Sequence, residues 1–144
     1  MPDCTDEASR SHDWLRVEIW KSEVVKSGIV RPDPEAELMT SERCAILESW
    51  NDESDDAVSI ARARVEPGVT TQLHRLDVDE RYVIVEGRGR VRVGELPVAQ
   101  VGTGDVVLIP AGTQQQITND RDSALVFYCI CSPRFDPAGY EPLE

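Results

Sequence analysis

The chain has 144 residues, which suits one domain with a single hydrophobic core. Its 40% hydrophobic content and mean hydropathy of -0.35 are typical of a globular protein, and no apolar run approaches the roughly 20 residues that a membrane helix needs. The net charge of -12 disfavours nucleic acids and anionic membranes as partners, because long-range repulsion opposes both.

The first eleven residues contain Asp3, Asp6 and Glu7 and have no basic start followed by an apolar stretch. We therefore expect no secretory signal and a cytoplasmic location. Four cysteines are spread along the chain, namely Cys4, Cys44, Cys129 and Cys131. They form no paired C-x-x-C motif, so we expect reduced thiols rather than a zinc site or a disulfide framework.

The N-terminal part of the chain has no clear secondary-structure pattern. Apolar residues between Asp13 and Val25 mix helical and strand spacing, which leaves the type of this segment open. Two prolines within residues 31–35 indicate a linker, because they interrupt both helices and strand ladders. We assign residues 1–40 to an N-terminal arm and linker.

Short strands are expected from residue 41 onward. Apolar or alternating runs over 44–47, 59–65, 81–85, 90–93, 106–109 and 124–131 are separated by turns that contain glycine or proline. No long helical pattern lies between them, which predicts an all-β sandwich or barrel over residues 41–135. Residues 136–144, with two prolines and a glycine, are expected to form an extended C-terminal tail.

Two blocks within this region share a regular spacing of glycine, proline and polar residues. The first contains Gly68, His74, Leu76, Glu80 and Gly87, and the second contains Gly104, Pro110, Gly112, Gln115 and Asn119. Both resemble the two sequence motifs of the cupin superfamily. The resemblance implies an all-β double-stranded β-helix, the cupin or jelly-roll barrel, here with an N-terminal arm.

The metal-binding residues of that family are only partly present. A typical cupin holds a divalent metal with three histidines and one glutamate from these motifs. His74 and Glu80 match two of the positions, whereas Leu76 and Gln115 stand at the others. His12 is the only other histidine, so a three-histidine site cannot form in the barrel, and a site with two histidines and one carboxylate would need His12 from the arm.

Two interpretations of these residues stay open. In the first, His74, Glu80 and Gln115 hold one divalent metal ion weakly, and Gln72 lies on the same strand face as His74, an arrangement that resembles the Gln-x-His ligand pair of cupin phosphomannose isomerases. In the second there is no metal: His74 is hydrogen-bonded in a polar barrel mouth, and Glu80 pairs with an inward arginine.

Polar residues inside a barrel favour a small-molecule site. The first functional hypothesis is an isomerase or lyase in which Glu80 or His74 moves a proton, with Tyr82 beside them as the third catalytic residue. Its ligand is small and polar or anionic, and the expected ligand-binding residues are Arg62, Arg64, Arg81 and Gln72.

The alternative is a non-catalytic, metal-free cupin module for binding or sensing. In either case the sheet edges and the arm predict a homodimer. All inward assignments depend on strand register, because a shift by one residue would turn every side chain to the opposite face.

Overall fold

The computed structural model describes residues 25–144, so the expectations for His12 and for most of the segment that begins at Asp13 lie outside the described residues. Eleven strands and two short 3-10 helices are present in the described part: η1 (Pro34–Ala36), β1 (Leu38–Met39), β2 (Ala45–Trp50), β3 (Ser59–Val65), β4 (His74–Leu76), β5 (Asp79–Glu86), β6 (Arg88–Val93), β7 (Ala99–Gly102), β8 (Val106–Ile109), β9 (Gln115–Thr118), β10 (Leu125–Ser132), η2 (Pro137–Gly139) and β11 (Tyr140–Pro142).

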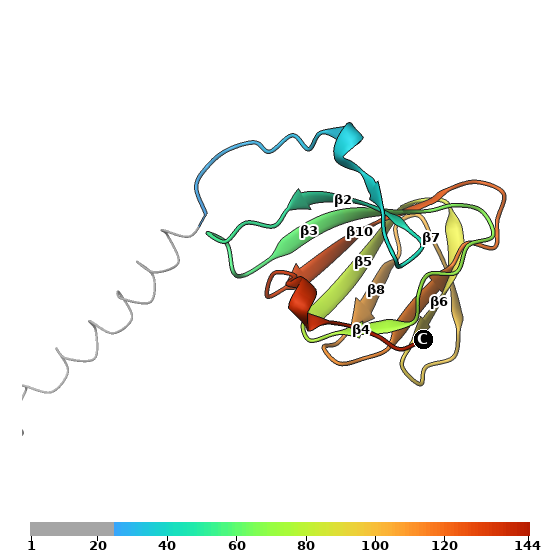
Figure 1. Cartoon of the computed structure of the whole chain (residues 1–144). Coiled ribbons are helices and arrows are strands. Elements are labelled where there is room, and N and C mark those ends of the chain that lie inside the picture. Colours follow the sequence, from blue (N-terminus) through green and yellow to red (C-terminus); the bar gives the residue numbers. More distant parts are fainter. Residues whose placement is uncertain (1–24) are drawn as a thin grey trace, which may run out of the picture.

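The strands form two antiparallel sheets that face each other (Figure 1). The larger sheet has the order β1-β2-β3-β10-β5-β8, and the smaller has the order β11-β4-β9-β6-β7. Strands that are neighbours in space come from distant parts of the chain, such as β3 and β10. This topology confirms the predicted all-β double-stranded β-helix.

Period-two alternation determines which side chains enter the interior. Along β5, Glu80, Tyr82 and Ile84 are buried, and the residues between them are more exposed. His74 and Leu76 are likewise buried on β4, on either side of exposed Arg75. The main hydrophobic core lies between the two sheets and includes Ile84, Ile117, Leu125 and Phe127.

Asn119 and Gly87 fix two turns at one end of the barrel. The Asn119 side chain is fully buried and donates hydrogen bonds to the carbonyl oxygens of Val65 and Ser123. Gly87 has a φ of 83°, and a Cβ there would lie 2.5 Å from the carbonyl oxygen of Ala124. Only glycine fits such a position, which explains its place in the first motif.

The segment before β2 crosses the outside of the larger sheet (Figure 1). Glu37 pairs there with Arg62, at 3.1 Å, and with Arg64, both on the outward face of β3. These ion pairs and the β1–β2 ladder attach residues 37–44, which we call the strap, to the barrel. Strand pairing therefore begins at Leu38, within the segment assigned to the arm.

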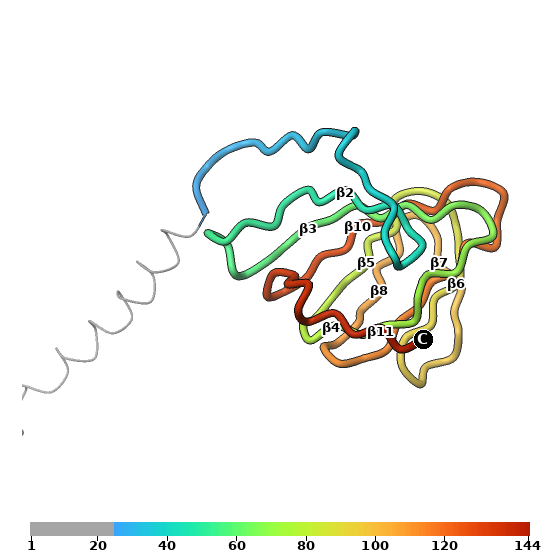
Figure 2. The backbone as a smooth tube through the Cα atoms, in the orientation of Figure 1, coloured from blue at the N-terminus to red at the C-terminus, as the bar shows by residue number. Residues whose placement is uncertain are grey.

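The C-terminal residues belong to the smaller sheet. β11 pairs with β4 through Tyr140 and Leu76, Glu141 and Arg75, and Pro142 and His74, and the two segments run side by side in Figure 2. Between residues 25 and 144, no helix has the length and apolarity to cross a membrane. Val106 and Leu108 on the edge strand β8 are exposed apolar side chains. Such an edge could pair with a second copy of the chain, and the homodimer expected from the sequence stays a prediction.

Candidate functional site

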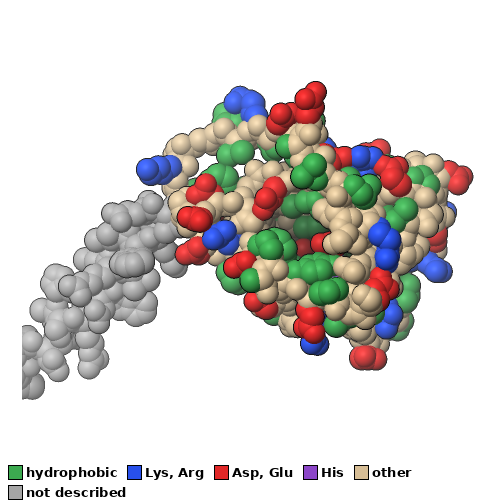
Figure 3. Space-filling model, in the orientation of Figure 1, with side chains coloured by type: hydrophobic (Ala, Val, Ile, Leu, Met, Phe, Trp, Pro, Cys, Tyr) green, Lys and Arg blue, Asp and Glu red, His purple; other side chains and the backbone are tan. Residues whose placement is uncertain are grey.

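A cavity of about 220 Å³ opens at one end of the barrel, bounded by strands of the larger sheet and by β4. Figure 3 shows a hollow in this face, rimmed largely by hydrophobic side chains. Apolar atoms make up most of the lining surface, and the apolar side chains there include Ile46, Ala61, Ala63, Leu76, Phe127 and Phe135. The polar and ionisable lining groups are Glu42, Cys44, Glu48, Ser59, Thr71, His74, Glu80, Tyr82, Cys129 and Cys131.

Glu80 is the most deeply buried carboxyl group that lines the cavity, with 6% of the residue exposed. Its Oε2 accepts a hydrogen bond from the Cys131 thiol at 3.4 Å, and its Oε1 has no partner in the described structure. Burial raises the pKa of Glu80 to about 7, with a smaller contribution from the charge of Glu42, while the Gln115 amide and the Cys131 thiol act in the opposite direction. The side chain can therefore give or take a proton near neutral pH.

Gln115 and Tyr82 form a buried contact next to Glu80. The Tyr82 hydroxyl donates a hydrogen bond to Gln115 Oε1, and Gln115 Nε2 is left without a hydrogen-bond partner. That nitrogen does not reach hydrogen-bonding geometry with Glu80, although the amide lies close enough to favour the charged carboxylate. Burial raises the pKa of Tyr82 well above its usual value, so the phenol stays protonated.

His74 is held in one orientation by its own strand and by β11. Its Nδ1 lies 2.7 Å from the carbonyl oxygen of Gln72, and a carbonyl can only accept, so Nδ1 carries a proton. The ring stacks on Tyr140, with centroids 4.7 Å apart and an interplanar angle of 21°. The second ring nitrogen, Nε2, is then free of a proton in the neutral form of the side chain.

The strap contributes two residues to the cavity that the sequence motifs do not contain. Glu42 and Cys44 both line it, and the Cys44 thiol lies 3.8 Å from Glu42 Oε2. Burial raises the pKa of Glu42, and the nearby His74 and the Cys44 thiol lower it. A single sequence offers only a weak signal for these residues, because the motif residues His74 and Glu80 that line the same cavity lie 30 or more residues further along the chain.

The predicted ligand-binding residues lie apart from the cavity lining. Arg62 and Arg64 are on the strap side of β3, and the Arg81 guanidinium donates to Ser132 Oγ at 2.6 Å on the outer face of β5. The Gln72 side chain accepts a hydrogen bond from the Tyr140 hydroxyl at 2.6 Å. The arrangement thus brings His74, Glu80, Tyr82 and Gln115 together and leaves the arginines outside.

The side chains at the predicted metal position do not fit a metal ion well. Gln115 directs its oxygen to the Tyr82 hydroxyl and leaves an amide nitrogen, which is not a metal ligand, toward Glu80. His74 and Glu80 then supply only two donors. Nowhere in residues 25–144 do three histidine, cysteine or acidic side chains come together in a way that could hold a metal.

Two facing antiparallel sheets with a polar site at one open end define a double-stranded β-helix barrel. The sequence comparison agrees, since residues 61–131 match the family described as Cupin domain. The protein is thus a cupin-domain protein, and the predicted resemblance is confirmed.

Solved structures with a similar fold are small bacterial barrels. A cupin 2 conserved barrel domain protein from Salinispora arenicola is 21% identical, with 78% of this chain and 92% of that chain covered and a TM-score of 0.63. A double-stranded β-helix protein from Klebsiella pneumoniae is 16% identical, with 83% and 99% covered and a TM-score of 0.61. Streptomyces Pac13, solved with uridine and described as a nucleoside dehydratase, is 14% identical, with 82% and 93% covered and a TM-score of 0.66. Identities this low show the fold alone.

One curated relative matches part of the chain. Endoribonuclease YbeY of Myxococcus xanthus is 30% identical over 84 residues, which are 58% of this chain. The match spans only 28% of that larger protein. Its activity is therefore a property of that protein and is not carried over.

Proposed function

We propose that the cavity binds a small uncharged hydroxy-carbonyl compound and that Glu80 transfers a proton to and from the carbon next to the carbonyl group. The observation that supports this most directly is the buried Glu80 carboxyl group, whose Oε1 is unpartnered and whose pKa is raised to about 7. Proton transfer of this kind is the step that isomerases and lyases share.

The cavity walls favour an uncharged ligand over an anionic one. Glu42 and Glu80 are acidic, and none of the lining residues is lysine or arginine. A carboxylate or phosphate there would meet like charges in a poorly solvated site, which is costly. The Ala63, Leu76 and Phe127 side chains would contact the apolar part of the ligand, and the polar groups would fix its orientation.

The first test is binding, measured by ligand-observed NMR with uridine, dihydroxyacetone and glyceraldehyde, each compared with glycerate and glycerol phosphate. We expect at least one uncharged compound to bind at least about tenfold more tightly than the anions, a ratio that corresponds to about 1.4 kcal/mol. Ala63→Leu should remove binding, because the larger side chain fills the cavity. Equal or tighter binding of the anions would contradict the proposed ligand class.

The second test is catalysis, measured as deuterium uptake from D2O at the carbon next to the carbonyl of dihydroxyacetone and glyceraldehyde. Wild type should promote uptake and Glu80→Gln should not, whereas Glu95→Gln, a change at an exposed glutamate outside the cavity, should behave as wild type. Binding without any deuterium uptake would favour the alternative of a non-catalytic binding or sensing module.

A further inference from the structure

The strap makes an unusual turn just before β2. The backbone N–H of Thr40 donates to the carbonyl oxygen of Cys44 at 3.0 Å, and the N–H of Arg43 donates to that of Thr40 at 3.1 Å. Arg43 closes the turn with a φ of 68°, the only left-handed residue other than glycine between residues 25 and 144. A long side chain in this conformation is uncommon, and such strain is often found at functional sites.

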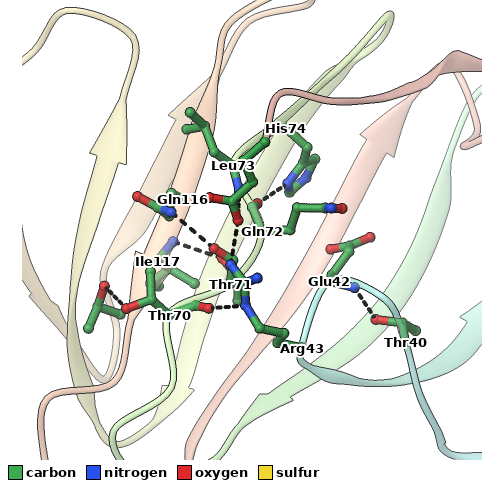
Figure 4. Close-up of polar contacts among 12 residues, drawn as sticks. Thr40, Glu42, Arg43, Thr70, Thr71, Gln72, Leu73, His74, Gln116 and Ile117 are labelled. Atoms are coloured by element: carbon green, nitrogen blue, oxygen red, sulfur yellow. Dashed lines mark hydrogen bonds and ion pairs between the residues drawn. The ribbon is translucent and has the colours of Figure 1, made fainter.

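Two contacts attach this turn to the segment that leads into His74 (Figure 4). The carbonyl oxygen of Glu42 accepts a hydrogen bond from the backbone N–H of Gln72 at 3.0 Å, and Arg43 Nε donates to the carbonyl oxygen of Thr70 at 2.7 Å. The Gln72 carbonyl oxygen in turn holds His74 Nδ1. Gln72 therefore fixes both the backbone that carries Glu42 and the imidazole ring.

The Glu42 carboxyl group enters the same cavity as Glu80 from a different element. Glu80 comes from β5 of the larger sheet, and Glu42 comes from the strap beside His74. Within the described residues Glu42 has no salt bridge, unlike Glu37, which pairs with two arginines. An acidic side chain that lines a largely apolar cavity without a basic partner is costly to keep charged, so Glu42 is more readily protonated than an exposed glutamate.

We propose that Glu42 is the second acid–base group of this cavity and acts on the ligand oxygen while Glu80 acts on the adjacent carbon. This inference rests on the proposed function. The Glu80 carboxylate takes the proton from the carbon next to the carbonyl group, and the C–H electron pair forms the carbon–carbon double bond of an enol. The carbonyl electron pair moves to oxygen, which receives the proton of the Glu42 carboxylic acid. The reverse transfers restore both side chains, and no oxidant or reductant is needed.

The pKa of both carboxyl groups is raised by burial, so each holds a proton at a higher pH than an exposed glutamate does. The charge of Glu42 also raises the pKa of Glu80, so the two groups can hold one proton between them, and the step starts from the form in which Glu42 carries it and Glu80 is charged. The Gln115 amide favours the charged form in which Glu80 starts, and His74 favours the charged form that Glu42 reaches after transfer. General acid catalysis of this kind contributes about 100-fold or more to a rate.

The test uses the same deuterium-uptake assay on the full chain, with Glu42→Gln compared with Glu80→Gln and with Glu95→Gln. Glu42→Gln should slow uptake by about 100-fold or more, since the amide cannot supply the proton. Glu42→Asp should recover part of the rate. A second measurement, by carbon-13 NMR of labelled glutamate carboxyl groups, should show the pKa of Glu80 falling in Glu42→Gln, because a neighbouring negative charge is removed.

The outcomes separate this inference from the proposed function. Uptake at the wild-type rate in Glu42→Gln, with uptake lost in Glu80→Gln, would overturn the role of Glu42 and leave that of Glu80. An unchanged Glu80 pKa in Glu42→Gln would also overturn it, since the two carboxyl groups would then not interact across the cavity. Wild-type uptake that survives Glu80→Gln, or no uptake by wild type, would overturn both.

Discussion

The Tyr82 hydroxyl on β5 donates a hydrogen bond to Gln115 Oε1 on β9, and this contact joins the two sheets across the interior. It also fixes which end of the amide faces Glu80. The position at which a typical cupin places a histidine ligand thus carries an amide N–H group close to a carboxyl group, without a hydrogen bond between them. This change turns a metal-ligand position into one that adjusts the charge of Glu80.

Tyr82→Phe should lower the free energy of unfolding by about 1–3 kcal/mol, because Gln115 Oε1 would be left buried without a donor. Urea denaturation measures the change. Tyr128→Phe serves as the control. Tyr128 lies on the face of β10 opposite to the buried Phe127, and it donates no side-chain hydrogen bond within the described structure. Equal losses in the two variants would show that the Tyr82–Gln115 contact adds nothing specific.

Glu80 should make stability depend on pH. Its pKa is about 7 in the folded protein and about 4.3 in an unfolded chain, so the folded state binds the proton more tightly. The resulting stabilisation is complete below the unfolded pKa and is lost as the pH rises through about 7. A shift of this size corresponds to a change on the order of 4 kcal/mol.

Glu80→Gln should therefore flatten the decline in stability between pH 5 and pH 8, and Glu95→Gln should leave it unchanged. Urea denaturation at several pH values measures both. Glu42 contributes in the same direction, because burial raises its pKa also, so some decline should persist in Glu80→Gln. A wild-type protein that is more stable at pH 8 than at pH 5 would contradict the raised pKa of Glu80.

The thiols around the cavity should react slowly. Burial raises the pKa of Cys44 to about 12 and also raises the pKa values of Cys129 and Cys131, and the nearby Glu80 charge adds to the effect at all three. Iodoacetamide alkylates the thiolate, which is scarce at pH 8. Peptide mapping by mass spectrometry should show slow labelling of these three residues in native protein and rapid labelling in guanidinium chloride. Native labelling at the denatured rate would contradict this prediction.

A metal site should be recoverable by substitution. Leu76→His with Gln115→His would place three histidines and Glu80 at the four positions of a typical cupin site, a donor set suited to borderline divalent metals. We expect the double variant to retain about one equivalent of cobalt or nickel after dialysis and the wild type to retain much less. The control is Leu73→His with Gln116→His, at neighbouring positions. Equal retention by all three proteins would show that the barrel interior is not the binding site.

The attachment of the strap to the barrel should depend on the Glu37 ion pairs. Glu37→Ala removes the ion pairs to Arg62 and Arg64, so we expect a loss of about 1 kcal/mol. Hydrogen exchange at Thr40 and Arg43 should increase. Glu35→Ala, on the same segment and without a salt bridge, is the control. Unchanged exchange in Glu37→Ala would mean that the β1–β2 ladder alone holds the strap.

The sequence predicts the parts of this protein that are determined by local spacing. Alternation places His74, Glu80 and Tyr82 inside, and the left-handed turns at Gly68, Gly87, Gly104 and Gly112 coincide with the motif glycines. Contacts between distant segments are not visible in this way. Glu42 reaches the cavity only because the strap bonds to Thr70 and Gln72. Arg62 and Arg64 alternate with Ala63 in the sequence, which does not say which of the two strand faces is buried. The structure buries Ala63, and the ion pairs with Glu37 place both arginines on the outward face.

The pairing of β11 with β4 has a consequence for synthesis on the ribosome. β4 shares three residue pairs with β11 but only one, His74 with Gln115, with β9. A nascent chain that has emerged through Ser132 already contains Glu42 and Glu80, yet His74 still lacks its stacking partner Tyr140. The part of the cavity wall that His74 forms is complete only when residues 140–142 have left the exit tunnel. The barrel should therefore acquire its ligand site later than its core.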